Sequence, residues 1–390
     1  MREARAQLRV RRGASHAVDP EVAVRELHAA IFDPEAALTV LFCSPSYDRD
    51  ALAAALRRHF GDARVIGCTT AGEISPRGYV EGSLTGVSLG GPGFAAVTAR
   101  IDGLASFELR RGEQVASAAF AELWTARCRA PEAVDTFAFL LVDGMSAKEE
   151  MLVAAINGGL GAIPLFGGSA ADGVRFGQTW LFHDGAFRTD CALLTLVSPG
   201  VPFSVFKTEG FVPSEARMVV TAADVVRRTV MEINGEPAAR EYARVAGLRP
   251  EELTPVAFAR YPVAVTVGGR VFVRSIQKVN ADESLTFFCA IDEGIVLRVA
   301  RGVDMVDNLA TAFAGVSATL GGPPTVVIGC DCIQRFLEAE RSGITSSVAS
   351  IHAANNVVGF ATYGEQWNAM HVNQTFTGVA LRAEDAGDER

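Results

Sequence analysis

The stretch VIGCTTAGE at residues 65–73 decides the fold, because it returns as VVGFATYGE at residues 357–365. At this constant offset the two copies share glycines, a hydroxyl and a carboxylate: Val65/Val357, Gly67/Gly359, Thr70/Thr362, Gly72/Gly364 and Glu73/Glu365. The agreement resumes over residues 85–89 and 377–381 without a gap. Identities of this kind at one fixed spacing indicate an internal duplication.

A third copy, LFGGSAAD at residues 165–172, lies 100 positions after the first. Each copy opens with an apolar run typical of a strand buried on both faces, at residues 38–42, 136–142 and 325–328. An amphipathic helix, a second short apolar run, a glycine turn and antiparallel strands follow. The sequence therefore predicts an α/β fold with mixed sheets, built from repeated strand-helix-strand-turn-strand units.

The repeats also divide the chain into domains. We expect a flexible segment over residues 1–24, an N-terminal domain of two units over 25–220, and a C-terminal domain over 221–382. This second domain combines an inserted β-rich segment with the third unit, and Ala222–Ile233 within the insert predicts a helix. Residues 383–390 are polar and small, which predicts a disordered tail.

Composition excludes several classes of protein. The 390 residues carry 36 Lys and Arg against 45 Asp and Glu, a net charge of −9 that disfavours nucleic acid and anionic lipid as partners. The apolar runs are shorter than the roughly 20 residues of a membrane-spanning helix, and the Arg-rich start lacks the apolar core of a signal peptide. Seven cysteines, mostly in apolar runs, predict free thiols. We therefore expect a cytoplasmic protein.

The three glycine turns are the strongest candidates for a site. They are the first turn (Gly67–Glu73), the second turn (Gly167–Asp172) and the third turn (Gly359–Glu365). Each follows a buried strand with backbone N–H groups, a small side chain and an acid, at the edge where α/β sheets bind ligands. The candidate ligand-binding residues are Cys68, Thr69, Thr70, Glu73, Gly168, Ser169, Asp172, Tyr363, Glu365, Gln366, His371 and Asn373. The alternative is that the glycines serve only tight packing.

Two histidines stand out because each lies in a strand after a glycine turn. His371 shares one strand face with Asn373, Thr375 and Thr377, a pattern that favours the wall of a polar pocket. His183 follows apolar residues and precedes a hairpin turn, so it is either a strand-end residue or the axial ligand of a haem. Cys68 as a nucleophile would make the protein a cysteine-dependent hydrolase, but no oxyanion-type signature surrounds it, and we expect no enzyme.

Taken together, the words VIGCTTAGEI, FGGSAADG with TWLFHDG, and VVGFATYGEQ with HVNQTFTGVAL resemble the FIST family over residues 25–382. The resemblance implies a FIST N-terminal and a FIST C-terminal domain. It also implies a sensory protein that binds a small polar molecule, such as an amino acid, and signals through a partner protein. Some free-standing members resemble haem-binding nitric-oxide sensors that regulate a histidine kinase in trans, which leaves haem b as an alternative, with His183 as the first candidate for its axial ligand and His371 and Tyr363 after it. The family offers no catalytic residues.

Overall fold

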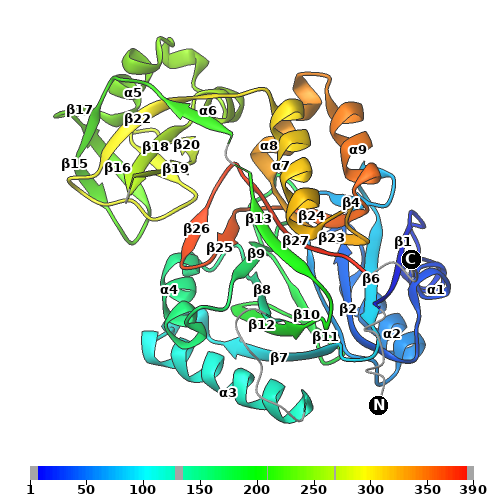
Figure 1. The fold of residues 1–390 in the computed structure, drawn as a ribbon. Helices are drawn as coiled ribbons and strands as arrows, with labels where there is room; N and C mark the ends of the chain where they lie inside the picture. The colour runs from blue at the N-terminus through cyan, green and yellow to red at the C-terminus, as the bar shows by residue number, and fades with distance from the viewer. Residues whose placement is uncertain (1–7, 128–134, 209, 268, 384–390) are drawn as a thin grey trace.

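Three mixed sheets of six strands and one inserted β-rich segment make up the fold in a computed structural model of the chain (Figure 1). The structure describes residues 8–127, 135–208, 210–267 and 269–383. The order of elements repeats three times, as strand, helix, strand, helix, strand, hairpin and strand. The predicted α/β class with repeated units is confirmed.

The first two units follow one another directly. The first contains β1 (Arg9–Ser15), α1 (Pro20–Ile31), β2 (Ala36–Cys43), α2 (Arg49–Phe60), β3 (Val65–Thr69), the hairpin β4 (Glu73–Ser75) and β5 (Gly78–Val80), and β6 (Leu84–Gly90). The second contains β7 (Ala95–Asp102), α3 (Leu109–Arg127), β8 (Phe137–Val142), α4 (Glu149–Leu160), β9 (Leu165–Ser169), the hairpin β10 (Leu181–His183) and β11 (Ala186–Arg188), and β12 (Cys191–Ser198).

The third unit is interrupted after its first strand. It contains β13 (Phe203–Lys207), α7 (Met305–Leu320), β23 (Val326–Cys332), α8 (Ile333–Arg341), α9 (Thr345–Ala354), β24 (Val357–Thr362), the hairpin β25 (Glu365–Trp367) and β26 (Met370–Val372), and β27 (Phe376–Leu381). The insert contains β14 (Phe211–Pro213), β15 (Met218–Asp224), β16 (Thr229–Ile233), β17 (Glu236–Pro237), α5 (Ala238–Ala246), α6 (Pro255–Arg260), β18 (Val263–Val267), β19 (Arg270–Arg274), β20 (Ile276–Val279), β21 (Leu285–Phe287) and β22 (Val296–Gly302).

The units exchange their hairpins in a closed cycle. The sheet of the first unit, β1-β6-β2-β3, is extended by the hairpin β10-β11 of the second unit. In the same way, the hairpin β25-β26 extends the sheet of the second unit, and β4-β5 extends that of the third. Each unit therefore completes the sheet of another, and the three glycine turns that precede the hairpins are brought together.

The repeated glycines Gly67, Gly167 and Gly359 lie at matching positions in the strands β3, β9 and β24. A Cβ atom there would lie 2.4, 2.0 and 1.9 Å, respectively, from a backbone carbonyl oxygen of the adjacent parallel strand. Any larger side chain would push the two strands apart. The predicted equivalence of these glycines is confirmed, but each lies within a strand and not in a turn, and close packing explains why each must be glycine.

The core lies between the three sheets, with helices outside. Phe42 stacks on Phe360 at 4.7 Å between ring centroids, and Phe139 stacks on Phe166 at 4.8 Å. All four rings are buried in one cluster, to which residues of all three units belong. Each ring contributes roughly 1.5–3 kcal/mol to the stability of the fold through burial of its apolar surface. Figure 1 shows α1 and α2 beside the first unit, α3 and α4 beside the second, and α7 and α9 beside the third.

Two expectations about local structure are wrong. The predicted helix Ala222–Ile233 is a hairpin of β15 and β16, because β-branched residues favour strands and Arg228 adopts a positive φ of 52° at the turn. The segment expected to be flexible holds β1, an edge strand paired with β6, and the start of α1, which Asp19 caps through Val22. Residues 1–7 and 384–390 lie outside the described residues.

The inserted strands confirm the predicted β-rich segment. Its hairpin tip is tied to α4 by Arg228, whose guanidinium lies 2.6 Å from carboxylate oxygens of both Glu149 and Glu150. The six cysteines of the described chain are buried, unpaired thiols, as expected. No helix in the described ranges has the length and apolar character needed to cross a membrane.

Candidate functional site

The three glycine turns form a closed ring of backbone hydrogen bonds. Ala71 of the first turn donates to the carbonyl of Ala361 in the third at 2.9 Å, and Ala171 of the second donates to Thr69 of the first at 2.9 Å. Ser169 of the second turn bonds to the third turn through both its N–H (2.9 Å) and its carbonyl (3.2 Å). The ring satisfies backbone groups that were expected to face a ligand, so binding must use side chains at its rim.

A pocket of about 450 Å³ opens at that rim, beside the first turn, where loops of the first two units meet the helix α8 of the third. Thr70, Glu73 and Asp172 are the predicted site residues that line it. Other lining residues carried no signal in the sequence. The polar ones are Ser44, Ser46, Glu81 and Arg175, and Ile333, Phe336 and Leu337 form an apolar wall. We call this space the first-turn pocket.

Glu73 forms the floor of the first-turn pocket. Its carboxylate accepts hydrogen bonds from the Thr70 hydroxyl and from both the backbone N–H (3.0 Å) and the hydroxyl (2.7 Å) of Ser83. Burial raises the pKa of Glu73 to about 7, although these hydrogen bonds act in the opposite direction. The group therefore changes charge near neutral pH.

Asp172 enters the pocket from the second turn. The Tyr363 hydroxyl donates a hydrogen bond to one carboxylate oxygen, and the N–H groups of Gly177 and Gln178 donate hydrogen bonds to the other, both at 2.9 Å. Burial raises the pKa of Asp172, but these hydrogen bonds outweigh it and the net pKa is lowered. Asp172 is therefore a fixed negative charge, and Tyr363 serves the site by holding it.

Arg175 supplies the positive charge of the pocket. It is exposed, and within the described ranges its guanidinium has no hydrogen bond or ion pair of its own. Glu81, just before β6, also lines the pocket and is exposed. Both residues are in loops that follow a hairpin or turn, which is the only sequence signal that could have drawn attention to them.

At the third turn, Glu365 has hydrogen-bond partners like those of Glu73, but it does not line the first-turn pocket. The carboxylate accepts hydrogen bonds from Thr362 and from the N–H (3.2 Å) and hydroxyl (2.7 Å) of Thr375. Burial raises the pKa of Glu365 to about 8, against the effect of these hydrogen bonds. Glu365 is therefore neutral at pH 7 and joins β25 to the strand β27.

We expect Glu365→Gln to change the pH dependence of stability. Because the folded protein holds the Glu365 proton up to about pH 8 and the unfolded chain only to about 4.5, Glu365 destabilises the fold increasingly as pH rises through that window, by up to about 1.4 kcal/mol per pH unit. The glutamine side chain has a similar size, can still accept hydrogen bonds and carries no charge. Urea unfolding should therefore show the variant close to the wild type at pH 4.5 and more stable at pH 9. A difference that is the same at both pH values would contradict this assignment.

The remaining predicted residues are held inside the fold. The hydroxyl of Thr69 accepts from the N–H of Trp180 (3.1 Å), and that of Ser169 accepts from the Gln366 amide (3.0 Å). Gly168 packs so closely that a Cβ atom would lie 2.7 Å from Thr362. These residues build the ring of turns, which is the packing role that the sequence left open as an alternative.

Cys68 belongs to the central core and does not line the first-turn pocket. It is 1% exposed, and burial raises the pKa of its thiol. A buried, protonated thiol is neither a nucleophile nor a polar ligand-binding group. His371 and Asn373 are also buried, at 2% and 1% exposure, and lie together behind the third turn.

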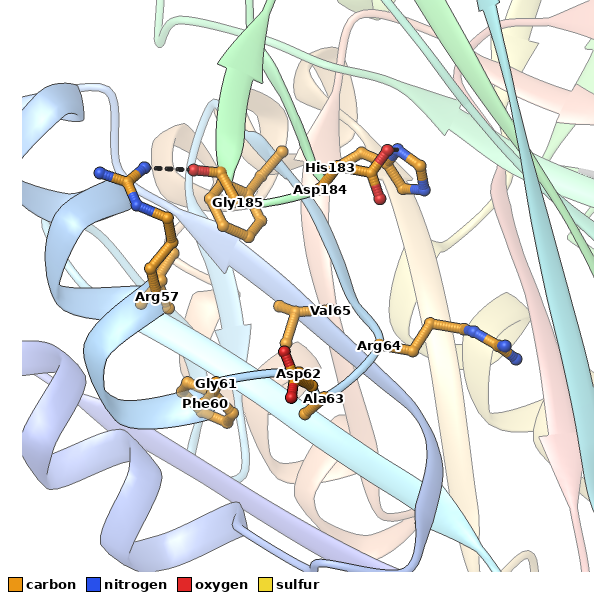
Figure 2. A pocket seen from close by; sticks show the side chains of 12 residues that line it. Arg57, Phe60, Gly61, Asp62, Ala63, Arg64, Val65, His183, Asp184 and Gly185 are labelled. Carbon is orange, nitrogen blue, oxygen red and sulfur yellow. Dashed lines mark hydrogen bonds and ion pairs between the residues drawn. The ribbon is translucent and has the colours of Figure 1, made fainter.

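The surroundings of His183 do not fit haem. The residue lies at the rim of a pocket of about 400 Å³ between the end of α2 and the β10-β11 turn (Figure 2). Its Nδ1 atom is 3.0 Å from the carboxylate of Asp184, and Arg57, Asp62 and Arg64 also line the pocket. An axial haem ligand needs an apolar cleft, and this pocket is rimmed by charges.

His371 does not fit haem either. A Cβ atom on Gly364 would already lie 2.6 Å from its Nε2 atom, so the turn itself occupies the space in front of the imidazole. The surroundings of neither histidine therefore fit a haem.

Comparison with known proteins identifies both halves of the chain. A sequence model of the FIST N domain matches residues 37–236, and one of the FIST C domain matches residues 238–368. No curated protein matches the sequence. Two solved structures of cyanuric acid hydrolase, one from A. caulinodans, are similar over 97% of this chain and 100% of theirs, at 10% identity and TM-scores of 0.42 and 0.37. A similarity of that strength says nothing about the site.

Proposed function

Because this chain belongs to the FIST family, whose domains are small-ligand sensors of signal transduction, we propose that it senses a small polar molecule in its first-turn pocket. The favoured ligand class is a free amino acid. We further propose that the protein acts by binding, in the cytoplasm, and passes its signal to a partner such as a histidine kinase. The six cysteines of the described residues are buried and unpaired, which supports a reducing compartment.

The observation that carries the proposal is the pairing of opposite charges around one pocket. Arg175 offers a planar guanidinium that suits a carboxylate, and Asp172 and Glu81 offer negative charge that suits an ammonium group. An α-amino acid carries both groups on adjacent atoms. Phe336 and Leu337 provide an apolar wall for its side chain.

Catalysis is disfavoured by the state of the reactive groups. The Cys68 thiol is buried in the core and its pKa is raised. Glu73, whose pKa is raised to about 7, accepts three hydrogen bonds from Thr70 and Ser83 of its own unit. These contacts support a role in shaping the pocket, and protonation of Glu73 gives ligand binding a dependence on pH near neutrality.

We expect Arg175→Ala to weaken binding of an amino acid by at least about tenfold, since it removes a charge-assisted hydrogen bond. The measurement is a thermal-shift screen of the 20 common amino acids, followed by calorimetric titration of the best one with the wild type and the variant. Arg110→Ala, at an exposed arginine on α3 that does not line the pocket, is the matched control and should bind as the wild type does.

The proposal fails if no amino acid raises the unfolding temperature, or if the amino acid that does so binds Arg175→Ala and wild type equally. Binding that Arg175→Ala and Arg110→Ala weaken to the same extent would also contradict it, because the loss would then follow net charge and not the pocket.

A further inference from the structure

A wide groove separates the insert from the third unit. The helix α6 of the insert lies beside α8 of the third unit (Figure 1), and the open space between the two walls measures about 1030 Å³. Residues between 248 and 261 line it from the insert, and residues between 337 and 342 line it from the third unit. We call this space the insert groove. Leu337 is the one lining residue that it shares with the first-turn pocket.

The walls of the insert groove expose apolar surface. Leu248, Val256 and Tyr261 of the insert are half-buried, and so is Leu337 on α8. Leu248 and Tyr261 pack against the core of the insert, whereas Leu337 packs against a separate cluster beside the turns. The flanks of two hydrophobic clusters therefore line one groove without covering each other. An apolar guest would remove this surface from water, which favours binding.

Two arginines add positive charge to the insert groove, one on each wall. Arg260 is the last residue of α6, and Arg341 is the last residue of α8. Both are exposed, and within the described ranges neither guanidinium has a hydrogen bond or an ion pair. Arg260 lies over the ring of Tyr261, with 5.4 Å from its guanidinium carbon to the ring centroid. A free guanidinium suits a carboxylate, to which it donates two parallel hydrogen bonds.

The acidic residues of the groove do not cancel this charge. Glu252 is already engaged by Arg249, which donates to it from its backbone N–H at 2.7 Å and from its guanidinium at 3.1 Å. Glu338 has no hydrogen bond or ion pair in the described part of the chain. Burial raises the pKa of Glu338, although the charges of Arg335 and Arg260 act in the opposite direction. Two free cations therefore face one free carboxylate.

We propose that the insert groove is a binding site for a molecule with an elongated apolar body and a terminal carboxylate. The body covers the apolar walls, and the carboxylate pairs with the side chains of Arg260 and Arg341. The groove has more than twice the volume of the first-turn pocket, so it suits a larger guest than a free amino acid. The proposal does not depend on what binds in the first-turn pocket.

The test uses octanoate as the probe. The neutral analogue 1-octanol keeps the apolar chain without the charge, and acetate keeps the carboxylate without the chain. The full chain is titrated with each molecule by calorimetry. We expect octanoate to bind saturably, with one molecule per chain, and both analogues to bind at least about tenfold more weakly. No saturable octanoate binding, or an analogue that binds as tightly as octanoate, would overturn the proposal.

Charge variants locate the site. The double variant Arg260→Ala with Arg341→Ala should weaken octanoate binding at least about tenfold, because it removes both partners of the carboxylate. Glu338→Gln removes the opposing charge and should strengthen binding, an effect that misfolding would not produce. Arg110→Ala, at an exposed arginine on α3 that does not line the groove, is the control and should bind as the wild type does.

Three results with these variants would overturn the site. They are octanoate binding unchanged in the double variant, binding weakened equally by Arg110→Ala, and binding weakened by Glu338→Gln. The oligomeric state gives a further check, since a second copy of the chain could cover the same apolar walls. A dimer in size-exclusion chromatography that the double variant dissociates would assign the groove to that second copy and overturn the proposal.

Discussion

Gly359→Ala should lower the free energy of unfolding by about 4 kcal/mol or more, a large part of the stability of a typical protein. The added Cβ atom would lie 1.9 Å from the carbonyl oxygen of Gly329 in the adjacent strand β23. The obstacle is backbone in the middle of a sheet buried on both faces, so it cannot rotate away as a flexible side chain would. Urea unfolding of the purified variant measures the loss.

The matched control is the same substitution at Gly315, an exposed position within α7. Apart from the neighbouring residues and backbone of its own helix, no described atom lies within 4 Å of a Cβ atom there, and replacing a helical glycine by alanine should stabilise the protein by about 0.5–1 kcal/mol. One chemical change thus has opposite expected effects at two sites. A loss below about 1 kcal/mol for Gly359→Ala would show that the strands separate easily, against the packing described here.

Asp331→Ala should cost about 3–5 kcal/mol, because it leaves a buried guanidinium without its counter-charge. Asp331 is fully buried and accepts a hydrogen bond from the Arg335 guanidinium at 2.7 Å. It accepts a second one from the hydroxyl of Tyr79, which lies in the exchanged hairpin β4-β5. Its loss therefore disrupts an ion pair and the attachment of the first unit to the third. Chemical unfolding and the loss of near-ultraviolet circular dichroism report both effects.

Two further variants separate the charge from the packing. Asp331→Ala combined with Arg335→Met removes both charges and should regain most of the lost stability. Arg240→Ala breaks an exposed pair with Glu283, at 2.9 Å, and should cost less than about 1 kcal/mol. If the double variant is as unstable as Asp331→Ala alone, the effect comes from lost packing and the ion-pair explanation is wrong.

The repeat allowed much of the fold to be predicted from sequence. Buried strands, helices and glycine turns recur in the same order within the one sequence, so Gly67, Gly167 and Gly359 could be equated by aligning the copies. The exchange of hairpins could not be predicted, because the same local sequence allows a hairpin to pair with the sheet of its own unit or with that of another unit. The helix expected at Ala222–Ile233 failed because the apolar pattern of so short a segment is ambiguous, and the pairing of β15 with β16 makes it a hairpin.

The site was harder to predict than the fold. Thr70, Glu73 and Asp172 were found because each lies in a repeated turn. Arg175 and Phe336 were missed because they carry no motif and reach the pocket only through the meeting of three units. Residues of the turns that point into the core, such as Cys68, could not be distinguished from those that face the pocket until the register was known.

The cyclic exchange of hairpins has a consequence for synthesis on the ribosome. The strand β4 pairs with β24, joining Ile74 to Gly359, so the hairpin emerges long before its partner has been translated. Until then its edges are unpaired and open to association with other chains. Closure of the ring depends on contacts between the two ends of the sequence, a topology that folds slowly. Nascent chains stalled before β24 therefore leave this hairpin without its partner strand.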